Sequence, residues 1–577
     1  MDNKSLDKVT QDFLDAMTTE SQKLMEMFGG KAGSGHDYLE KFNAAWAQVL
    51  QAPKTPDDLM KAVSDYQKNQ LELWAGLLGN APDGATKPAS KDRRFHSEEW
   101  SENPVFNYIK ESYLMASHML QKTAQNANLD PKRQKKLEFY TQQYIDALSP
   151  SNFAATNPEV IKHAIDTKGQ SLMDGLQNLM GDMEKGRISM TDETAFTLGE
   201  NIATTPGAVI FENDLMQLIQ YAPATDKVAG RPLLIIPPCI NKFYILDLQP
   251  HNSFVKYAVD QGNTVFLVSW VNATPEQRHL SWDNYVESGV FKALDVAKAV
   301  SGSKRVNCVA WCVGGTITAS AMAVLAARKD NTISSATFLT TLTDFEDPGE
   351  IEVFIDGDDA KKILGDVDAA GVLDGKNLAN VFNMLRSNDL IWSNVVNNYL
   401  KGKSPAPFDI LYWNSDPTSL PADMYNYYLS NMYQQNNLIK PDCLSICGEK
   451  VNLGKISTPC YFLSCVDDHI APWKSTFAAT DIIPNVEFVL GGSGHVAGVI
   501  NPASKNRRNH WIKGESGKGP DHWLETAKDV QGTWWNHWAP WVKKRAGKQV
   551  AAPQALGNKD YPPLEPAPGS FVKARIN

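Results

Sequence analysis

The chain has 577 residues, 42% of them hydrophobic and 21% charged, and its 56 basic and 66 acidic side chains leave a net charge of −10. This composition is typical of a folded protein and excludes a wholly disordered chain. A net acidic chain is also a poor candidate for general nucleic-acid binding, which depends on basic surfaces.

The N-terminal residues and the lengths of the apolar runs indicate where in the cell the protein is expected. Residues 1–7 (MDNKSLD) lack the basic segment and apolar run of a secretory signal, and no apolar stretch reaches the roughly 18–20 residues of a membrane helix. We therefore expect a cytoplasmic protein without a membrane span. Its seven cysteines should be reduced there, so each is a packing residue, a ligand or a nucleophile.

Residues 1–195 show helical periodicity and no pattern of a parallel sheet. Apolar residues recur at three- and four-residue spacing in three segments, 38–46, 59–63 and 98–181. Pro53 and Pro56 separate the first two segments, and residues 80–85 (NAPDGA) are predicted to be a turn or linker. We predict a helical N-terminal domain over 1–195.

Short apolar runs alternate with helical patterns after about residue 195. The runs are 233–236, 264–269, 306–309, 338–341, 460–465 and 487–490. Buried strands that alternate with helices predict an α/β domain with a mostly parallel sheet over 196–577. Residues 345–455 interrupt this rhythm with many Asp, Asn and aromatic residues, and we predict that they form a cap inserted between strands. The proline-rich tail from about 546 is expected to be extended.

The sharpest motif is 309–316 (VAWCVGGT), which ends a predicted strand and opens a helix. α/β-Hydrolases place their nucleophile at such a turn, with small residues two positions before and after it because the turn is tight. Cys312 holds the nucleophile position, Gly314 follows it, and Ala310 stands where glycine is usual. A buried core cysteine is the alternative. Because an acyl-cysteine is itself a thioester, cysteine here favours acyl transfer over simple hydrolysis.

An acid and a base follow in the order that this fold uses. Asp467 and Asp468 come directly after one predicted strand, and His495 lies in a glycine-rich loop after the last one. The order nucleophile, acid, base and the position of each after a strand match an α/β-hydrolase site. Asp467 and Asp468 compete for the acid because only one should face the site. His469 is a weaker candidate base, and a hydrogen-bonded loop histidine is the alternative for His495.

Two backbone amides are candidates for an oxyanion hole. One belongs to Val313, which follows the nucleophile, and the other to Ile240, in the segment 237–242 (PPCINK) after an early strand. Backbone donors leave no side-chain signature, so these assignments depend on position alone.

A basic loop follows His495. Lys505, Arg507 and Arg508 could bind the phosphates of a nucleotide-bearing substrate, with a solvated loop as the alternative. The remaining cysteines lack the Cys-x-x-Cys spacing of zinc sites, so we predict packing and no metal site. Four tryptophans at near-helical spacing are predicted to pack in the core, with contact to a hydrophobic surface as the alternative: Trp534, Trp535, Trp538 and Trp541.

Taken together, these motifs resemble the class I polyhydroxyalkanoate synthases, which polymerise (R)-3-hydroxyacyl-CoA. The resemblance covers about residues 93–577. It is carried by the segments 94–95, 97–100, 207–209, 211–213, 237–249, 264–270, 309–316, 468–473, 493–502 and 565–569. It implies an α/β-hydrolase fold with an inserted cap, preceded by a mostly helical domain.

The resemblance also implies roles and partners. Cys312 would be the nucleophile, His495 the base, and Asp468 an acid that orients the histidine or helps to deprotonate the incoming 3-hydroxyl. Short-chain substrates such as (R)-3-hydroxybutyryl-CoA are expected, with coenzyme A as the leaving group and no cofactor. Expected partners are the growing polyester, the surface of its cytoplasmic granules and a second copy in a homodimer. The alternatives are a thioesterase or polyhydroxyalkanoate depolymerase on the same frame, and a non-catalytic granule-associated protein.

Overall fold

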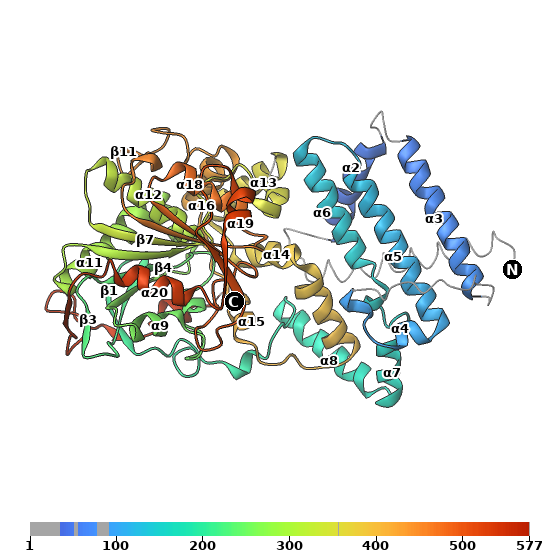
Figure 1. Cartoon of the computed structure of the whole chain (residues 1–577). Helices are drawn as coiled ribbons and strands as arrows, with labels where there is room; N and C mark the ends of the chain where they lie inside the picture. The colour runs from blue at the N-terminus through green and yellow to red at the C-terminus, as the bar shows by residue number, and fades with distance from the viewer. Residues whose placement is uncertain (1–34, 51–55, 78–91, 356, 576–577) are drawn as a thin grey trace. The chain divides into compact units, whose positions relative to one another are not determined.

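The computed structural model describes residues 35–50, 56–77, 92–355 and 357–575. The chain divides into two compact units (Figure 1). A helical unit comprises Met1–Asp192 and Asn380–Ala406, and a catalytic unit comprises Glu193–Ala379 and Pro407–Asn577. The segment Asn380–Ala406 thus groups with the N-terminal helices, although the sequence pattern places it inside the cap.

The described part of the helical unit is built from helices with strong N-terminal signals. The main helices are α2 (Gly35–Leu50), α3 (Pro56–Leu77), α4 (Glu99–Glu102), α5 (Pro104–Gln125), α6 (Pro131–Ala147), α7 (Pro158–Asp166) and α8 (Gln170–Lys185). Asn103, Asp130 and Asn157 each precede a proline, and each side chain accepts hydrogen bonds from amides of the first turn. Such caps satisfy amides that have no helical partner, and proline at the first position needs none.

The predicted helical character of this region is confirmed for the described residues. The predicted linker at 80–85 and the break at Pro53 lie outside them. None of the described helices is both long and apolar enough to cross a membrane.

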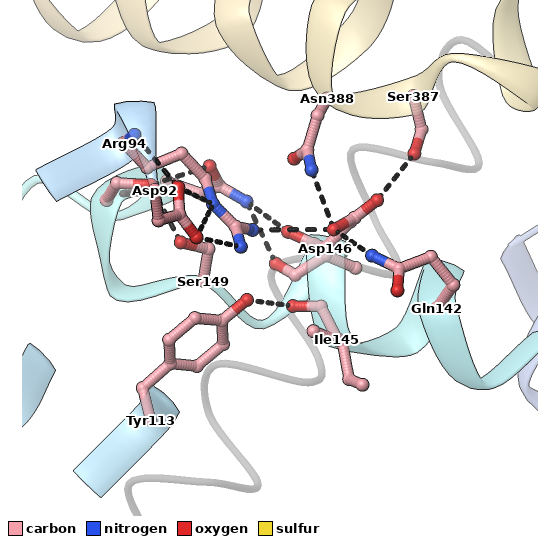
Figure 2. A network of polar contacts seen from close by, with 12 residues as sticks. Asp92, Arg94, Tyr113, Gln142, Ile145, Asp146, Ser149, Ser387 and Asn388 are labelled. Atoms are coloured by element: carbon pink, nitrogen blue, oxygen red, sulfur yellow. Dashed lines mark hydrogen bonds and ion pairs between the residues drawn. The ribbon is translucent and has the colours of Figure 1, made fainter. Parts of the chain in front are cut away.

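A buried polar network joins helix α6 to the segment Asn380–Ala406 within the helical unit (Figure 2). Asp146 accepts hydrogen bonds from the side chains of Gln142, Asn388 and Ser387 at 2.8, 2.7 and 3.2 Å. The Arg94 guanidinium lies 3.4 Å from the same carboxylate. Burial raises the pKa of Asp146, while Arg94 and the hydrogen bonds oppose that rise.

An eleven-stranded sheet forms the centre of the catalytic unit (Figure 1). Its order is β15 (Lys528–Gln531), β14 (Asn509–Ile512), β13 (Val486–Gly491), β12 (Cys460–Cys465), β7 (Ile333–Leu339), β6 (Val306–Trp311), β4 (Leu233–Ile236), β5 (Val265–Trp270), β2 (Met216–Tyr221), β1 (Gly207–Glu212) and β17 (Glu565–Pro566). The six strands from β13 to β5 are parallel, and the strands on either side of them pair antiparallel.

The parallel strands coincide with the six predicted apolar runs. Every residue of β4, β5, β6, β7 and β12 is buried, because helices cover both faces of a parallel sheet. The run predicted at 338–341 is displaced, since Ser334, Ser335 and Thr337 dilute the apolar character of the true strand. The antiparallel strands were not predicted, and polar residues interrupt the apolar pattern of β2 (MQLIQY) and β15 (KDVQ).

The four tryptophans lie in the core, as predicted. Trp534 and the three tryptophans of α20 (Trp535–Lys543) are between 0% and 6% exposed. Their cluster includes Phe254 of α9 (Phe254–Asp260), on the face of the sheet opposite α12 (Val313–Ala327) (Figure 1). The alternative of contact with a hydrophobic surface is therefore wrong.

Candidate active site

Cys312 lies at the sharp turn between β6 and α12. Its φ of 52° and ψ of −126° belong to a region that side-chain-bearing residues rarely adopt, at a cost of about 1–3 kcal/mol. Backbone hydrogen bonds hold this conformation: the Cys312 amide donates to the Leu339 carbonyl at 3.0 Å, and its carbonyl accepts from the Gly315 amide at 2.8 Å. The turn presents the thiol at the carboxyl end of the parallel sheet, where nucleophiles of this fold lie.

The two small residues near the turn, Gly314 and Ala310, are under different steric constraints. A Cβ on Gly314 would overlap the carbonyls of Ile236 and Pro237, so α12 can approach the neighbouring strand only with glycine there. Ala310 is 1% exposed within β6, and the strained turn at Cys312 forms with its methyl group in place. Gly314, two positions after the nucleophile, is therefore required to be glycine, whereas the position two before it accommodates Ala310.

Asp468 and His495 meet above the ends of β12 and β13. Nδ1 of His495 lies 2.7 Å from Oδ2 of Asp468, and their side chains are 8% and 0% exposed. The other carboxylate oxygen, Oδ1, accepts the amides of Ile470 and Ala471 at 2.9 and 2.8 Å. Both oxygens are thus engaged, which fixes the carboxylate and the ring that it holds.

The structure also distinguishes between the two neighbouring aspartates that compete for the acid position. Asp467 is exposed, while Asp468 is buried against His495. The Asp467 amide donates to the Ser493 carbonyl at 3.0 Å, which joins the two loops. The side chain that faces the site is therefore Asp468.

Electrostatic interactions join His495 to Cys312. Burial alone would lower the pKa of His495, but the Asp468 carboxylate, Cys312 and hydrogen bonds with both raise it to about 10. The ring of Trp311, the residue before the cysteine, lies 6.2 Å from the imidazole. A histidine in this setting has a high affinity for a proton taken from the neighbouring thiol.

The two candidate oxyanion donors flank the cysteine. Val313 begins α12, and the segment 237–242 lies against that helix start, where Pro237 would contact a side chain at Gly314. Cys239, next to Ile240, is close enough to Cys312 for the two thiols to interact electrostatically. Within the described residues, the amides of Val313 and Ile240 donate to no backbone carbonyl.

Two cap tyrosines next to Cys312 escaped the sequence analysis. Tyr428 ends α16 (Ala422–Tyr428), Tyr433 lies in the helical turn η10 (Leu429–Gln434), and their rings are 5.2 Å apart. Burial raises the pKa of both phenols, and Cys312 contributes to both shifts. Their signal was the aromatic segment 425–433 (YNYYLSNMY), but sequence alone could not direct it to the cysteine.

The other predicted residues lie apart from this cluster of interactions. Lys505, Arg507 and Arg508 are exposed, and the Arg508 guanidinium donates to the Ala497 carbonyl. Their contact with a nucleotide stays a prediction. Within the described ranges, no three or more His, Cys, Asp or Glu side chains are grouped as metal ligands.

The strand order and the positions of Cys312, Asp468 and His495 define an α/β-hydrolase fold, as the sequence predicts. A family model for the alpha/beta hydrolase fold matches residues 232–502. A second model, for the N-terminus of poly-beta-hydroxybutyrate polymerase (PhaC), matches residues 91–258.

Curated relatives extend this similarity over most of the chain. The poly(3-hydroxyalkanoate) polymerase subunit PhaC of Cupriavidus necator is 44% identical over 95% of this chain and 93% of its own length. The corresponding subunit of Rhizobium meliloti is 40% identical over 93% and 94%. A solved monoacylglycerol lipase of Paleococcus ferrophilus is 10% identical, covering 57% of this chain and 99% of the lipase with a TM-score of 0.33.

The chain belongs to the poly(3-hydroxyalkanoate) polymerase family, which confirms the predicted resemblance. It is an enzyme of polyester synthesis on an α/β-hydrolase fold. This membership sets aside the alternative of a non-catalytic granule-associated protein.

Proposed function

We propose that the enzyme polymerises (R)-3-hydroxyacyl-CoA through a thioester on Cys312. The observation that carries this proposal is the strained Cys312 turn beside the buried His495–Asp468 pair. In the first half-reaction, His495 takes the proton of the thiol, and the sulfur attacks the thioester carbonyl of the substrate. The amides of Val313 and Ile240 stabilise the resulting oxyanion. The C–S bond to coenzyme A then breaks, and His495 returns the proton to the departing thiolate.

The second half-reaction makes the ester bond. The 3-hydroxyl of another acyl unit attacks the Cys312 thioester while His495 accepts the hydroxyl proton. A C–O bond forms, the C–S bond to Cys312 breaks, and the proton returns from His495 to the sulfur. Asp468 holds the imidazole in place and stabilises its charged form.

The cap residues favour transfer to a hydroxyl over transfer to water. Hydrolysis of the Cys312 thioester would end the chain, so the site must be protected from water during growth. Tyr428 and Tyr433, which both interact electrostatically with Cys312, pack with Phe345, whose ring lies 6.0 and 4.9 Å from theirs. This aromatic cover supports a synthase over a thioesterase or depolymerase on the same frame.

For the substrate, we propose short acyl chains such as (R)-3-hydroxybutyryl-CoA, with the coenzyme A phosphates near Lys505, Arg507 and Arg508. Identity above 40% with two relatives named for the 3-hydroxyalkanoate polymer supports the acyl class. The basic loop follows directly after the base in sequence, which supports the phosphate contact. The reaction requires no cofactor beyond the coenzyme A that the substrate carries.

The test is to incubate the purified chain with (R)-3-hydroxybutyryl-CoA and to measure free coenzyme A together with the product. Coenzyme A release with insoluble polyester is expected. Release with only monomeric acid would make the protein a thioesterase and contradict polymer growth. A parallel reaction with a longer 3-hydroxyacyl-CoA tests the chain-length proposal, because a short-chain enzyme should turn it over more slowly.

We also propose that the enzyme acts as a homodimer on cytoplasmic granules and touches their surface through α7 and α8. These helices expose six large apolar side chains: Ile165, Leu172, Met173, Leu176, Met180 and Met183. Helix α8 carries three acidic residues and one basic residue, which suits a neutral polyester better than an anionic membrane. Its other face is fixed, since the Tyr399 hydroxyl donates to Asp182 at 2.7 Å.

The granule proposal predicts that Met173→Glu with Met180→Glu reduces binding to polyester granules while preserving coenzyme A release. Gln177→Glu, on the same helix, is the charge control and should still bind. Equal granule binding by all variants would contradict the proposed surface. Sedimentation of the wild-type chain as a monomer at every concentration would contradict the dimer.

A further inference from the structure

The segment that carries the proposed oxyanion donor Ile240 is joined to residues 413–418, a stretch within the cap. The Thr418 amide donates to the Ile240 carbonyl at 2.9 Å, and Asn241 forms an antiparallel bridge with Pro417. The Trp413 indole donates to the Lys242 carbonyl at 2.7 Å. Three successive residues of the segment are therefore held by one stretch of the cap.

A buried ion pair lies beneath these backbone contacts. Nζ of Lys242 is 2.9 Å from Oδ1 of Asp416, and their side chains are only 4% and 2% exposed. The Tyr244 hydroxyl donates to Oδ2 of the same carboxylate at 3.0 Å. A buried ion pair is a costly way to gain stability, because removing two charges from water offsets most of their attraction. Its position beside Ile240 suggests a second purpose.

The C-terminal end of the described chain completes this arrangement. Lys242 also donates to the Ala574 carbonyl at 2.7 Å, and Asn272 donates to the same oxygen at 3.3 Å. The neighbouring Arg575 lies 4.0 Å from Asp416 and 3.8 Å from Glu193. The Lys242 ammonium therefore connects three separate parts of the catalytic unit: the oxyanion segment, residues 413–418 of the cap and the C-terminal tail.

We propose that Lys242 is a positioning residue, whose ammonium holds the Ile240 amide at the place where negative charge develops on the acyl carbonyl. This inference rests on the proposed thioester mechanism. Lys242 itself does not touch the acyl group; it acts through the backbone of its own segment. Oxyanion donors are effective only when their geometry is fixed in advance, and losing one typically costs about 10²–10³-fold in rate. A misplaced donor is therefore expected to slow acylation by about 10–10²-fold.

The experiment compares two reactions of the same sulfur. Acylation by (R)-3-hydroxybutyryl-CoA requires the oxyanion donors, whereas alkylation of Cys312 by iodoacetamide requires only a reactive and accessible thiol. Lys242→Met removes the ammonium and keeps most of the apolar volume. A chain ending at Lys573 removes the Ala574 acceptor, and both described residues that it removes, Ala574 and Arg575, are exposed, so it serves where Lys242→Met does not fold. Lys256→Met is the matched control, because Lys256 pairs with Asp260 at 2.6 Å on the surface of the same unit.

We expect Lys242→Met and the shortened chain to acylate about 10–10²-fold more slowly, with kcat lowered, KM within about twofold and alkylation unchanged. Lys256→Met should match the wild type in both reactions. Wild-type rates of acylation in the Lys242→Met and shortened chains would overturn the positioning role. Equal losses of acylation and alkylation would also overturn it, since they would show a general disturbance of the site. A wild-type chain that forms no thioester would instead overturn the proposed function and this inference with it.

Discussion

Each unit of the molecule buries a carboxylate beside a basic partner, Asp146 beside Arg94 in the helical unit and Asp468 beside His495 in the catalytic unit, and of these two only Asp468 lies at the candidate active site. In the helical unit, Asp146 meets Arg94 and accepts three further side-chain hydrogen bonds (Figure 2). In the catalytic unit, Asp468 accepts two amides and holds His495 at 2.7 Å. Burial and ionic pairing are therefore shared by both pairs and do not distinguish a catalytic group.

The two pairs differ in the group that neighbours the basic residue on the side away from the buried carboxylate. Arg94 is enclosed by carboxylates, since it also pairs with Asp92 at 2.7 Å, and a guanidinium does not exchange its proton near neutral pH. His495 keeps one ring nitrogen for the carboxylate and interacts with Cys312 on its other side. A proton can move between Cys312 and His495, whereas Arg94 and Asp146 can only hold helices together.

The largest expected effect is at Cys312. Cys312→Ala removes the sulfur that carries the acyl group, so coenzyme A release should fall by roughly 10⁴-fold or more. Cys308→Ala is the matched control, because Cys308 is buried in β6, four positions before Cys312. It should stay within a few-fold of the wild type. Substantial turnover by Cys312→Ala would contradict the thioester mechanism.

Substitutions of the two neighbouring aspartates compare, within one loop, the carboxylate that holds His495 with one that is exposed. Asp468→Asn should reduce coenzyme A release by about 10²–10⁴-fold, because the amide cannot stabilise a charged imidazole. Asp467→Asn, at the exposed position, should change the rate less than about twofold. Similar losses in both variants, measured at saturating substrate, would show that the loop matters only as a structure.

The pair in the helical unit should affect stability and not rate. Asp146→Ala leaves Arg94 paired with the Asp92 carboxylate and is expected to cost about 3 kcal/mol, at the lower end for a broken buried pair. Native-state hydrogen exchange in α6 and residues 387–400 measures this loss. Coenzyme A release per folded molecule should change by less than about twofold. A large loss of rate with unchanged exchange would give the helical pair a functional role.

The smallest effect is a pH dependence that has the same direction at the two carboxylate pairs, because His495 and Asp146 both have raised pKa values. His495 has a folded-state pKa of about 10 against an ordinary value of 6.5, so its contribution to stability is complete below pH 6.5 and is lost as pH rises towards 10. Burial raises the pKa of Asp146, so its contribution to stability is also greatest at low pH and falls as pH rises through the raised pKa. The denaturation midpoint of wild type minus that of His495→Gln should therefore shrink from pH 6 to pH 10. A difference that stays constant or grows would contradict the assigned charge state.

Sequence patterns predicted the parts of the fold that are buried on both sides. The parallel strands are nearly continuous apolar runs. The turn at Cys312 is marked by Gly314, which must be glycine because a Cβ there would overlap the carbonyls of Ile236 and Pro237. The same patterns placed Asp468 and His495 at strand ends, where the structure joins them. Their catalytic roles stay predictions until the variants are measured.

Other features have no local signal. Tyr428 and Tyr433 reach Cys312 only because the cap folds back over the sheet, and no periodicity encodes that return. The segment Asn380–Ala406 joins the helical unit through Ser387 and Asn388, two polar residues that resemble any exposed pair until Asp146 is found opposite them. Contacts between segments about 240 residues apart depend on tertiary structure and not on local pattern.

The most direct test of the account is to map the acyl group itself. The wild-type chain is mixed with (R)-3-hydroxybutyryl-CoA, quenched in acid within one turnover, digested and measured by mass spectrometry, with Cys312→Ala as the control. We expect one or more 3-hydroxybutyryl units on the peptide that contains Cys312, released by hydroxylamine and absent from the variant. Polyester formed by a chain whose acyl units lie on another residue, or equally by Cys312→Ala, would contradict the central claim.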